Sequence, residues 1–324
     1  MAKEKETSGE SCWRTSIGGQ ALIEGILMRG PEKQAIVVRR PDGGLEIKTE
    51  ELKLIKQRYP ILGLPLIRGC VTFLDSMVRG VKALMFSADF YPEDEAAQPS
   101  KLEQWLEAHL SSEAFSKAIV GLSVVLGIGF SVGLFFLLPA ILTNLLGHLV
   151  PLNKLGVSLA EGVVRIIIFF LYLVMISRMS DIHRVFSYHG AEHKTIFCYE
   201  RGLELTVENV RKMPRHHPRC GTSFLFVVVA VAILVHAALF TLIPPPNIFV
   251  RILMQLISLP VIVAISYEFN RFAGAHDNAL TRILTAPGLW MQNFTTFEPD
   301  DSMIEVGIES LKQVLPSVKG QDRW

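Results

Sequence analysis

Charged residues are scarce in this sequence. They make up 19% of the 324 residues, whereas a soluble domain carries about a quarter. Basic and acidic residues nearly cancel, giving a formal net charge of +1, so the composition predicts no nucleic-acid partner. The uncharged residues gather in a few long apolar runs, and the mean hydropathy is +0.35. This distribution predicts an integral membrane protein whose partner is the lipid bilayer.

Cysteines are also few. The four of them (Cys12, Cys70, Cys198 and Cys220) have no framework spacing, and the orientation predicted below places them in the cytoplasm, where thiols stay reduced. We therefore expect no structural disulfide. The polar first 15 residues are not followed by an apolar segment, so we also expect no signal peptide.

Four apolar runs are long enough to cross the roughly 30 Å hydrocarbon core of a bilayer as helices. The second run gives the weakest signal, because Glu161 and Arg165 lie near its start. The predicted spans are 118–142, 157–179, 223–243 and 248–267.

Lysine and arginine in the short connections predict the orientation of these spans. The connection 143–156 holds only Lys154, and 244–247 holds neither residue type. Cytoplasmic loops are enriched in both, so the basic connection 180–222 and both termini are predicted to be cytoplasmic in an inner-membrane, multi-pass protein. That connection holds Arg184, Lys194, Arg201, Arg211, Lys212, Arg215 and Arg219.

The rest of the chain predicts a mainly α polytopic helical bundle, with about four spans, an interfacial helix and a small cytoplasmic β element near the N-terminus. Two β-rich runs flank Pro41-Asp42-Gly43-Gly44, which is typical of a hairpin. In the segment 61–86, a mostly basic stripe of Arg68, Asp75, Arg79 and Lys82 is backed by an apolar one, which favours a helix in the membrane interface; a packed soluble helix is the alternative. Asp300 or Asp301 is expected to cap a last amphipathic helix. The predicted segments are a disordered tail (1–15), the hairpin segment (16–60), the amphipathic helix (61–86), an acidic linker with a short helix (87–117), a first membrane helix pair (118–179), a His/Cys loop (180–222), a second pair (223–268) and C-terminal helices (269–324), with turns expected at Gly274 and Pro287-Gly288.

An H-x-x-E-H motif lies in the basic connection. On a helix, His189 and His193 are one turn apart on the same face, so both imidazoles can reach one divalent metal ion, with zinc as the first candidate. Glu192 lies beside them and can act on water, as in inverted zinc-protease motifs. Gly190 within the motif costs a helix about 1 kcal/mol relative to alanine.

A second motif, RHHPRCGT, precedes the third span. His217 and Cys220 are good ligand types for closing the same site. Alternatively, Pro218 and Gly221 simply shape a turn. Basic residues near both motifs, with Arg29 further upstream, can hold an anion such as a phospholipid head group, or merely obey the positive-inside rule. The predicted anion-binding residues are Lys194, Arg215, Arg219 and Arg29.

A glycine-rich segment, GGQALIEGILMRGP, opens the expected folded region at residues 18–31. Its glycines allow a close approach of the backbone to a ligand, but a tight structural turn explains them equally well. Glu24 is a candidate third metal ligand or base, and its alternative is a solvated surface carboxylate.

Polar residues also lie inside the predicted spans. Glu161 and Arg165 are one helical turn apart and can pair, and His236 lies at a similar depth from the other side. Such a cluster can mark a transport pathway, although a structural role is the more common one.

The motifs together identify a family. GGQALIEGILMRGP, YHGAEHKTIFCYE, HPRCGTSFL and APGLW followed by TTFEPDD resemble the YqhQ-like family of bacterial membrane proteins, known as domain of unknown function 1385. The similarity extends over residues 16–315. It implies a bacterial membrane location and a predicted metal-dependent enzyme, without an established substrate.

Three functional hypotheses follow. The first is a metal-dependent, hydrolase-like enzyme at the cytoplasmic membrane face, acting on a lipid or another membrane-proximal substrate, with Glu192 or Glu24 as catalytic residues. The second is a scaffold or assembly factor with a structural His/Cys site, which four protein ligands would close. A transporter ranks third, because many transporters are built from internal repeats and none is evident here. Convergence of Glu161, Arg165 and His236 would favour it. The sequence leaves the oligomeric state open.

Overall fold

The computed structural model describes residues 13–52, 59–91, 112–149, 153–276, 278–318 and 320–323. Most of the predicted acidic linker and residues 1–12 of the predicted tail lie outside these ranges. The chain forms two compact units. The first comprises Met1–Tyr91, Leu173–Val228 and Val263–Trp324, and the second comprises Pro92–Tyr172 and Val229–Ile262.

A four-stranded antiparallel sheet in the order β1-β2-β3-β4 forms the centre of the first unit. The predicted hairpin is confirmed, because Arg39 pairs with Leu45 across the turn. The glycine-rich segment forms a second hairpin that the sequence did not predict, with Glu24 at a φ of 51° in its turn. The strands are β1 Gly18–Leu22, β2 Gly25–Arg29, β3 Lys33–Arg39 and β4 Leu45–Glu51.

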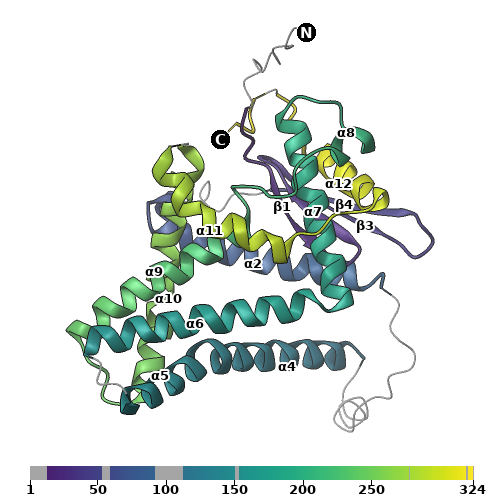
Figure 1. The fold of residues 1–324 in the computed structure, drawn as a ribbon. Helices are drawn as coiled ribbons and strands as arrows, with labels where there is room; N and C mark the ends of the chain where they lie inside the picture. Colours follow the sequence, from purple (N-terminus) through teal and green to yellow (C-terminus); the bar gives the residue numbers. More distant parts are fainter. Residues whose placement is uncertain are drawn as a thin grey trace, which may run out of the picture. The chain divides into compact units, whose positions relative to one another are not determined.

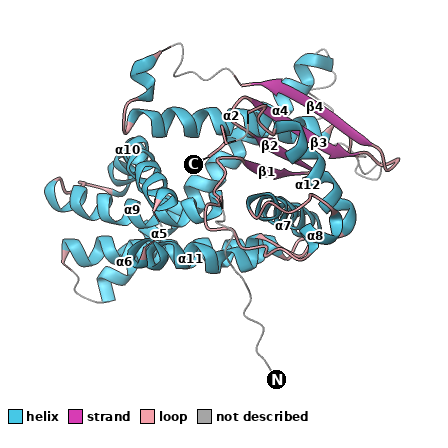
Figure 2. Ribbon diagram, turned by 90° about the horizontal axis from the view of Figure 1, so that it is seen from above, coloured by secondary structure: helices cyan, strands magenta, loops and turns pink. Residues whose placement is uncertain are grey.

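Helices cover both faces of this sheet (Figures 1 and 2). Side chains on successive residues of a strand point to opposite faces, so Met28 packs against α7 (Ser180–Glu200) and α12 (Asp301–Val314), whereas Leu27 packs against α2 (Ile67–Ala88). Burial on both faces explains the unbroken apolar run in β2 and β3.

The last helix begins where the sequence predicted. The Asp300 carboxylate accepts a hydrogen bond of 2.9 Å from the Met303 N–H and so caps α12. Its expected apolar face is buried, because Met303, Val306, Ile308 and Leu311 all lie in the core.

Within the described ranges, four helices are long and apolar enough to cross a membrane, which agrees with the predicted number and indicates a membrane protein. The first extends past its predicted end and contains a π-helical turn, Gly133–Leu137. The candidate spans are Gly121–Leu149, Leu155–Ser177, Phe224–Leu242 and Ile248–Gly274, within α4 (Ser112–Val132) and α5 (Leu138–Leu149), α6 (Lys154–Ser177), α9 (Gly221–Leu242) and α10 (Ile248–Ala275).

The predicted amphipathic segment 61–86 contains α2. Its polar residues contact other parts of the first unit, since Arg68 pairs with Glu268 and Asp75 with Arg29. Several apolar side chains of α2 are exposed, including Met77 at 52%. Its position in a membrane interface stays a prediction.

Three features of the structure differ from the predictions. The connection 180–222 is mostly ordered helix rather than loop, because α7 and α8 (Val207–Arg211) occupy it. The turn predicted at Pro287-Gly288 is wrong, since α11 (Ala279–Thr295) continues through it. The predicted tail is too long, because Thr15 forms a β-bridge with Arg323.

Candidate metal centre

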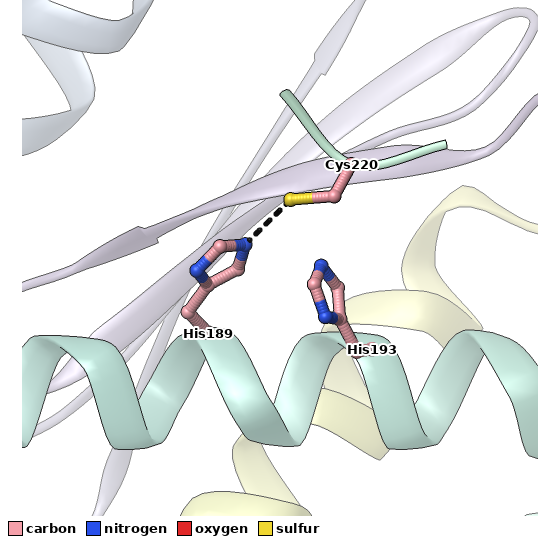
Figure 3. A group of neighbouring side chains, drawn as sticks. All are labelled: His189, His193 and Cys220. Carbon is pink, nitrogen blue, oxygen red and sulfur yellow. Dashed lines mark hydrogen bonds between the residues drawn. The ribbon is translucent and has the colours of Figure 1, made fainter. Parts of the chain in front are cut away.

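Two histidines and a cysteine converge in the first unit. His189 and His193 extend from one face of α7, and Cys220 directly precedes α9 (Figure 3). The distance from His189 Nε2 to Cys220 Sγ is 3.1 Å. One ligand atom from each residue lies within 4.8 Å of the other two. The helical H-x-x-E-H motif therefore presents its two imidazoles to a cysteine sulfur, a third candidate metal ligand.

Backbone carbonyl groups orient both imidazoles. His189 donates its Nδ1–H to the Thr295 carbonyl oxygen at 2.8 Å, and His193 donates its Nδ1–H to that of Arg215 at 2.5 Å. A carbonyl oxygen can only accept, so each Nδ1 carries a proton and Nε2 is the ring nitrogen that can bind a metal once it is deprotonated. Histidine ligands in metalloproteins are oriented in the same way.

The surroundings of Cys220 favour its thiolate. Burial by itself raises the pKa of Cys220, but the charges of His189 and His193 and their hydrogen bonds outweigh it and hold this pKa well below its usual value. Burial lowers the pKa of His189, and the Cys220 thiolate more than compensates, raising it to about 9. The Thr222 N–H, in the first turn of α9, also donates to Sγ at 3.4 Å. The thiolate is the form of cysteine that binds metals.

Glu192 adds a buried carboxylate beside the three ligands. Its Oε1 accepts the Gly19 N–H at 2.8 Å, whereas its Oε2 has no hydrogen-bond partner among the described residues. Burial raises the pKa of Glu192, and the charges of His189 and His193 partly offset this effect. A buried, unsatisfied carboxylate oxygen indicates a ligand or water position next to it.

These residues line a cavity of about 470 Å³. Its other walls come from the start of the folded chain, from β2 and from α2. The cavity leaves room for a small ligand beside the three candidate metal ligands. Lining residues include Gly18, Gly19, Gln20, Arg29, Gln34, Ser76, Arg79, His217 and Arg219.

The unfavourable Gly190 in the helical motif has a packing reason. A Cβ at this position would lie 2.0 Å from the carbonyl oxygen of Phe297. Glycine therefore lets the chain after α11 approach α7, where Phe297 donates its N–H to the Phe186 carbonyl oxygen at 3.0 Å. The same approach brings the Thr295 carbonyl oxygen to His189.

His217 lies next to this group but not in it. Its Nε2 is 3.7 Å from Glu200 Oε2, and its ring centroid is 5.5 Å from that of His193. Burial lowers the pKa of His217, and Glu200 only partly offsets this. Glu200 also pairs with Arg219 and accepts the Thr15 N–H. The structure thus places His217 in a separate polar cluster on the cavity wall.

Glu24 is not brought to the cavity. Its carboxylate forms a two-pronged ion pair with Arg184 and accepts the Tyr188 hydroxyl at 3.1 Å. Because Tyr188 is buried in the core beneath the sheet, Glu24 ties the β1–β2 turn to α7.

The predicted anion-binding residues separate into two groups. Arg29 and Arg219 line the cavity, whereas Lys194 and Arg215 do not. Lys194 is buried and pairs with Glu298, and its Nζ also donates to the Arg211 carbonyl oxygen at 2.9 Å. Arg79 is a cavity residue that the sequence reasoning missed, although it stands in the basic stripe of the segment 61–86.

In the second unit, Glu161, Arg165 and His236 converge. Arg165 donates to Glu161 at 2.8 Å and lies 3.4 Å from His236 Nδ1. Arg251, which the sequence reasoning did not include, approaches Glu161 to 2.5 Å from α10.

The remaining bonds of this cluster reach all four candidate spans. Arg165 Nε donates to the Phe135 carbonyl oxygen in the π-helical turn at 2.8 Å. His236 Nε2 lies 2.9 Å from the Ser258 hydroxyl. The convergence is what a transporter would need, but these contacts also account for it as interhelical bonding that makes the buried charges tolerable.

Comparisons with known proteins agree with the motifs. Residues 64–317 match the model of a family described as protein of unknown function (DUF1385). The chain is 33% identical over 303 residues to the uncharacterized protein YqhQ of Bacillus subtilis (strain 168), covering 92% of each chain. No solved structure matches it. The chain belongs to the DUF1385 family.

Proposed function

We propose that this protein is a metal-dependent hydrolase of the bacterial inner membrane, with a divalent cation, zinc first among the candidates, held by His189, His193 and Cys220. One observation carries the proposal: three ligand atoms lie within 4.8 Å of one another beside Glu192, whose buried Oε2 has no partner among the described residues.

The donor set fits a catalytic metal. Two imidazole nitrogens and a thiolate suit zinc, and catalytic zinc sites use three protein ligands and leave the fourth position open. A cation bound there supplies Lewis-acid activation of a substrate and of water. The cavity leads to this position, so a substrate can reach it.

Glu192 is the proposed general base. The Gly19 N–H holds one carboxylate oxygen, which leaves the other free to accept a proton from water. The burial that raises the pKa of Glu192 brings the carboxylate closer to the neutral range in which a general base is most effective. When the leaving group departs, Glu192 can return the proton to it.

A scaffold with a structural metal is the alternative. Such a site is closed by four protein ligands, and His217, the other histidine expected from the sequence to close it, contacts Glu200 instead. This arrangement supports the enzyme over the scaffold. The positive-inside rule, applied to the candidate spans, supports a cytoplasmic location for both termini and the site, which suits a lipid or another membrane-proximal substrate.

Metal analysis tests the proposal. The protein is purified in detergent without a histidine tag or chelators, and bound metal is quantified by mass spectrometry in the parent and in the His189→Ala/His193→Ala variant. We expect near-stoichiometric metal in the parent and none in the variant, because two of the three ligands are lost. A His148→Ala/His276→Ala variant, which removes two exposed histidines, is expected to keep its metal.

A parent that binds no metal, even after reconstitution with zinc, manganese or iron, would contradict the proposal. Equal metal loss in both double variants would contradict the assigned ligands.

Glu192→Gln separates catalysis from metal binding. We expect it to keep its metal but to lose turnover by about 10²- to 10⁴-fold, the usual contribution of a general base. The parent is first screened on esters, phosphoesters and amides, and the variant is then compared on any hydrolysed compound at equal metal occupancy. Retention of most of the parent's rate would rule out Glu192 as the base.

A further inference from the structure

Two arginines occupy a wall of the cavity to which the proposed chemistry assigns no role. Arg29 lies at the end of β2 and Arg79 lies on α2, and both line the cavity. Each bonds a different oxygen of the same carboxylate, Asp75, at 3.1 Å and 2.8 Å. Two cations therefore share one anion.

The surrounding charges do not cancel this excess. Glu50, which accepts from Gln34 at 3.0 Å, is balanced by Lys48 at 3.2 Å. On the opposite side of the cavity, Arg219 is paired with Glu200. The wall around Arg29 and Arg79 consequently keeps a net positive charge.

The excess positive charge of this wall faces the cavity. Asp75 is not among the lining residues, and Glu192 is the sole carboxylate residue among those described as lining it. The side chains of Arg29 and Arg79 are 29% and 25% exposed, whereas that of Asp75 is 16% exposed. A ligand in the cavity therefore meets guanidinium groups rather than the carboxylate that they share.

The hydrogen-bonding capacity of this wall fits phosphate. A guanidinium group has five N–H donors in a planar fork, which matches the oxygens of phosphate. Arg79 uses its Nε for Asp75 and lies 3.5 Å from the Gln34 side-chain oxygen through Nη1. Ser76 and Gln20 add neutral hydrogen-bonding groups to the cavity wall.

We infer that Arg29 and Arg79 form a phosphate-binding subsite, so that the substrate carries a phosphate group, on a lipid or on a small molecule. The claim about the substrate rests on the proposed hydrolase function. Phosphate binding itself does not, because none of its residues is a proposed metal ligand.

Binding measurements on the metal-free full chain in uncharged detergent test the subsite. Inorganic phosphate is titrated by calorimetry into the parent, Arg79→Ala and Arg40→Ala, an exposed arginine paired with Asp42 on the β3–β4 turn. We expect Arg79→Ala to weaken binding by about tenfold or more, the effect of losing a charged hydrogen bond. Arg40→Ala should bind like the parent. Equal binding by Arg79→Ala and the parent, or no phosphate binding by the parent, would overturn the subsite.

The variant Asp75→Asn distinguishes phosphate binding by Arg79 from a purely structural role of Arg79. Without the shared carboxylate both guanidiniums can turn to the ligand, so we expect tighter phosphate binding. Unchanged or weaker binding in a folded Asp75→Asn variant would overturn the inference, and this criterion holds even if Arg79→Ala fails to fold.

Two further arms identify the source of the phosphate and separate the two proposals. Binding to micelles containing phosphatidic acid is compared with binding to micelles containing diacylglycerol, which lacks the phosphate. Tighter binding of phosphatidic acid than of inorganic phosphate indicates that the phosphate belongs to a lipid. The His189→Ala/His193→Ala variant should bind phosphate like the metal-free parent. A parent that takes up no metal on reconstitution, yet still binds phosphate through Arg79, would contradict the hydrolase and leave the subsite intact.

Discussion

Replacement of Glu161 by glutamine is expected to destabilise the protein by about 3–5 kcal/mol, the cost of removing one partner from a buried ion pair. Glu161 is 2% exposed and lies within bonding distance of both Arg165 and Arg251. Without its charge, two guanidiniums remain in an apolar bundle with no carboxylate to compensate them. We expect the midpoint of thermal unfolding in detergent to fall by on the order of 10 °C.

A matched change at the surface serves as the control. Glu208 forms an i,i+4 ion pair with Lys212, and the two side chains are 77% and 62% exposed. Glu208→Gln should leave the unfolding midpoint unchanged, because exposed pairs contribute little. In Glu161→Gln/Arg251→Gln the net charge of the cluster returns to that of the parent, so part of the stability should be recovered. A Glu161→Gln variant as stable as Glu208→Gln would contradict the ion-pair cluster.

Gly190→Ala is expected to destabilise the protein, although alanine is usually the better helix residue by about 1 kcal/mol. The added Cβ would lie 2.0 Å from the Phe297 carbonyl oxygen, so α7 and the chain after α11 must separate. Overpacking of this kind costs typically about 1–3 kcal/mol. Since Thr295 orients His189, the separation should also reduce metal occupancy. Thermal unfolding and metal content are measured on the same sample.

The control is a helical glycine with open space around it. Beyond the neighbouring residues and backbone of its own helix, no atom of the described residues lies within 4 Å of a Cβ built at Gly127, so Gly127→Ala should be neutral or slightly stabilising. If Gly190→Ala behaved in the same way, the close contact between α7 and Phe297 would be wrong.

The elements that the sequence predicts well are those with a local cause. The four apolar runs are enough to predict the spans. The turn residues before Leu45 are enough to predict the β3–β4 hairpin, and Asp300 is enough to predict where α12 begins. The β1–β2 hairpin was missed because its glycines, favourable in turns, are unfavourable in strands. These strands form through pairing and through burial against α7 and α12, which no short window of sequence reveals.

The site follows the same rule. His189 and His193 are fixed by helical spacing, and Cys220 was found by ligand type alone. The roles of Glu24 and His217 depend on Arg184 and Glu200, whose positions only the tertiary structure gives. Arg79 was assigned to a membrane surface because its stripe is amphipathic, whereas the fold directs it into the cavity.

The hydrogen bonds around the candidate metal ligands join segments that are synthesised at very different times during translation. Glu192 bonds a residue 173 positions earlier, and His189 bonds one 106 positions later. The face of β2 that packs against α12 is likewise buried late in synthesis, since Ser310 contacts the carbonyl oxygen of Ile26, 284 positions earlier in the sequence. The same face of the β1–β2 hairpin is also covered by α7, so both helices must be synthesised before this face is fully buried. The nascent chain must therefore keep part of an apolar sheet face unaggregated until α12 has been synthesised, and His189 gains the carbonyl oxygen that orients it only after Thr295 has been synthesised.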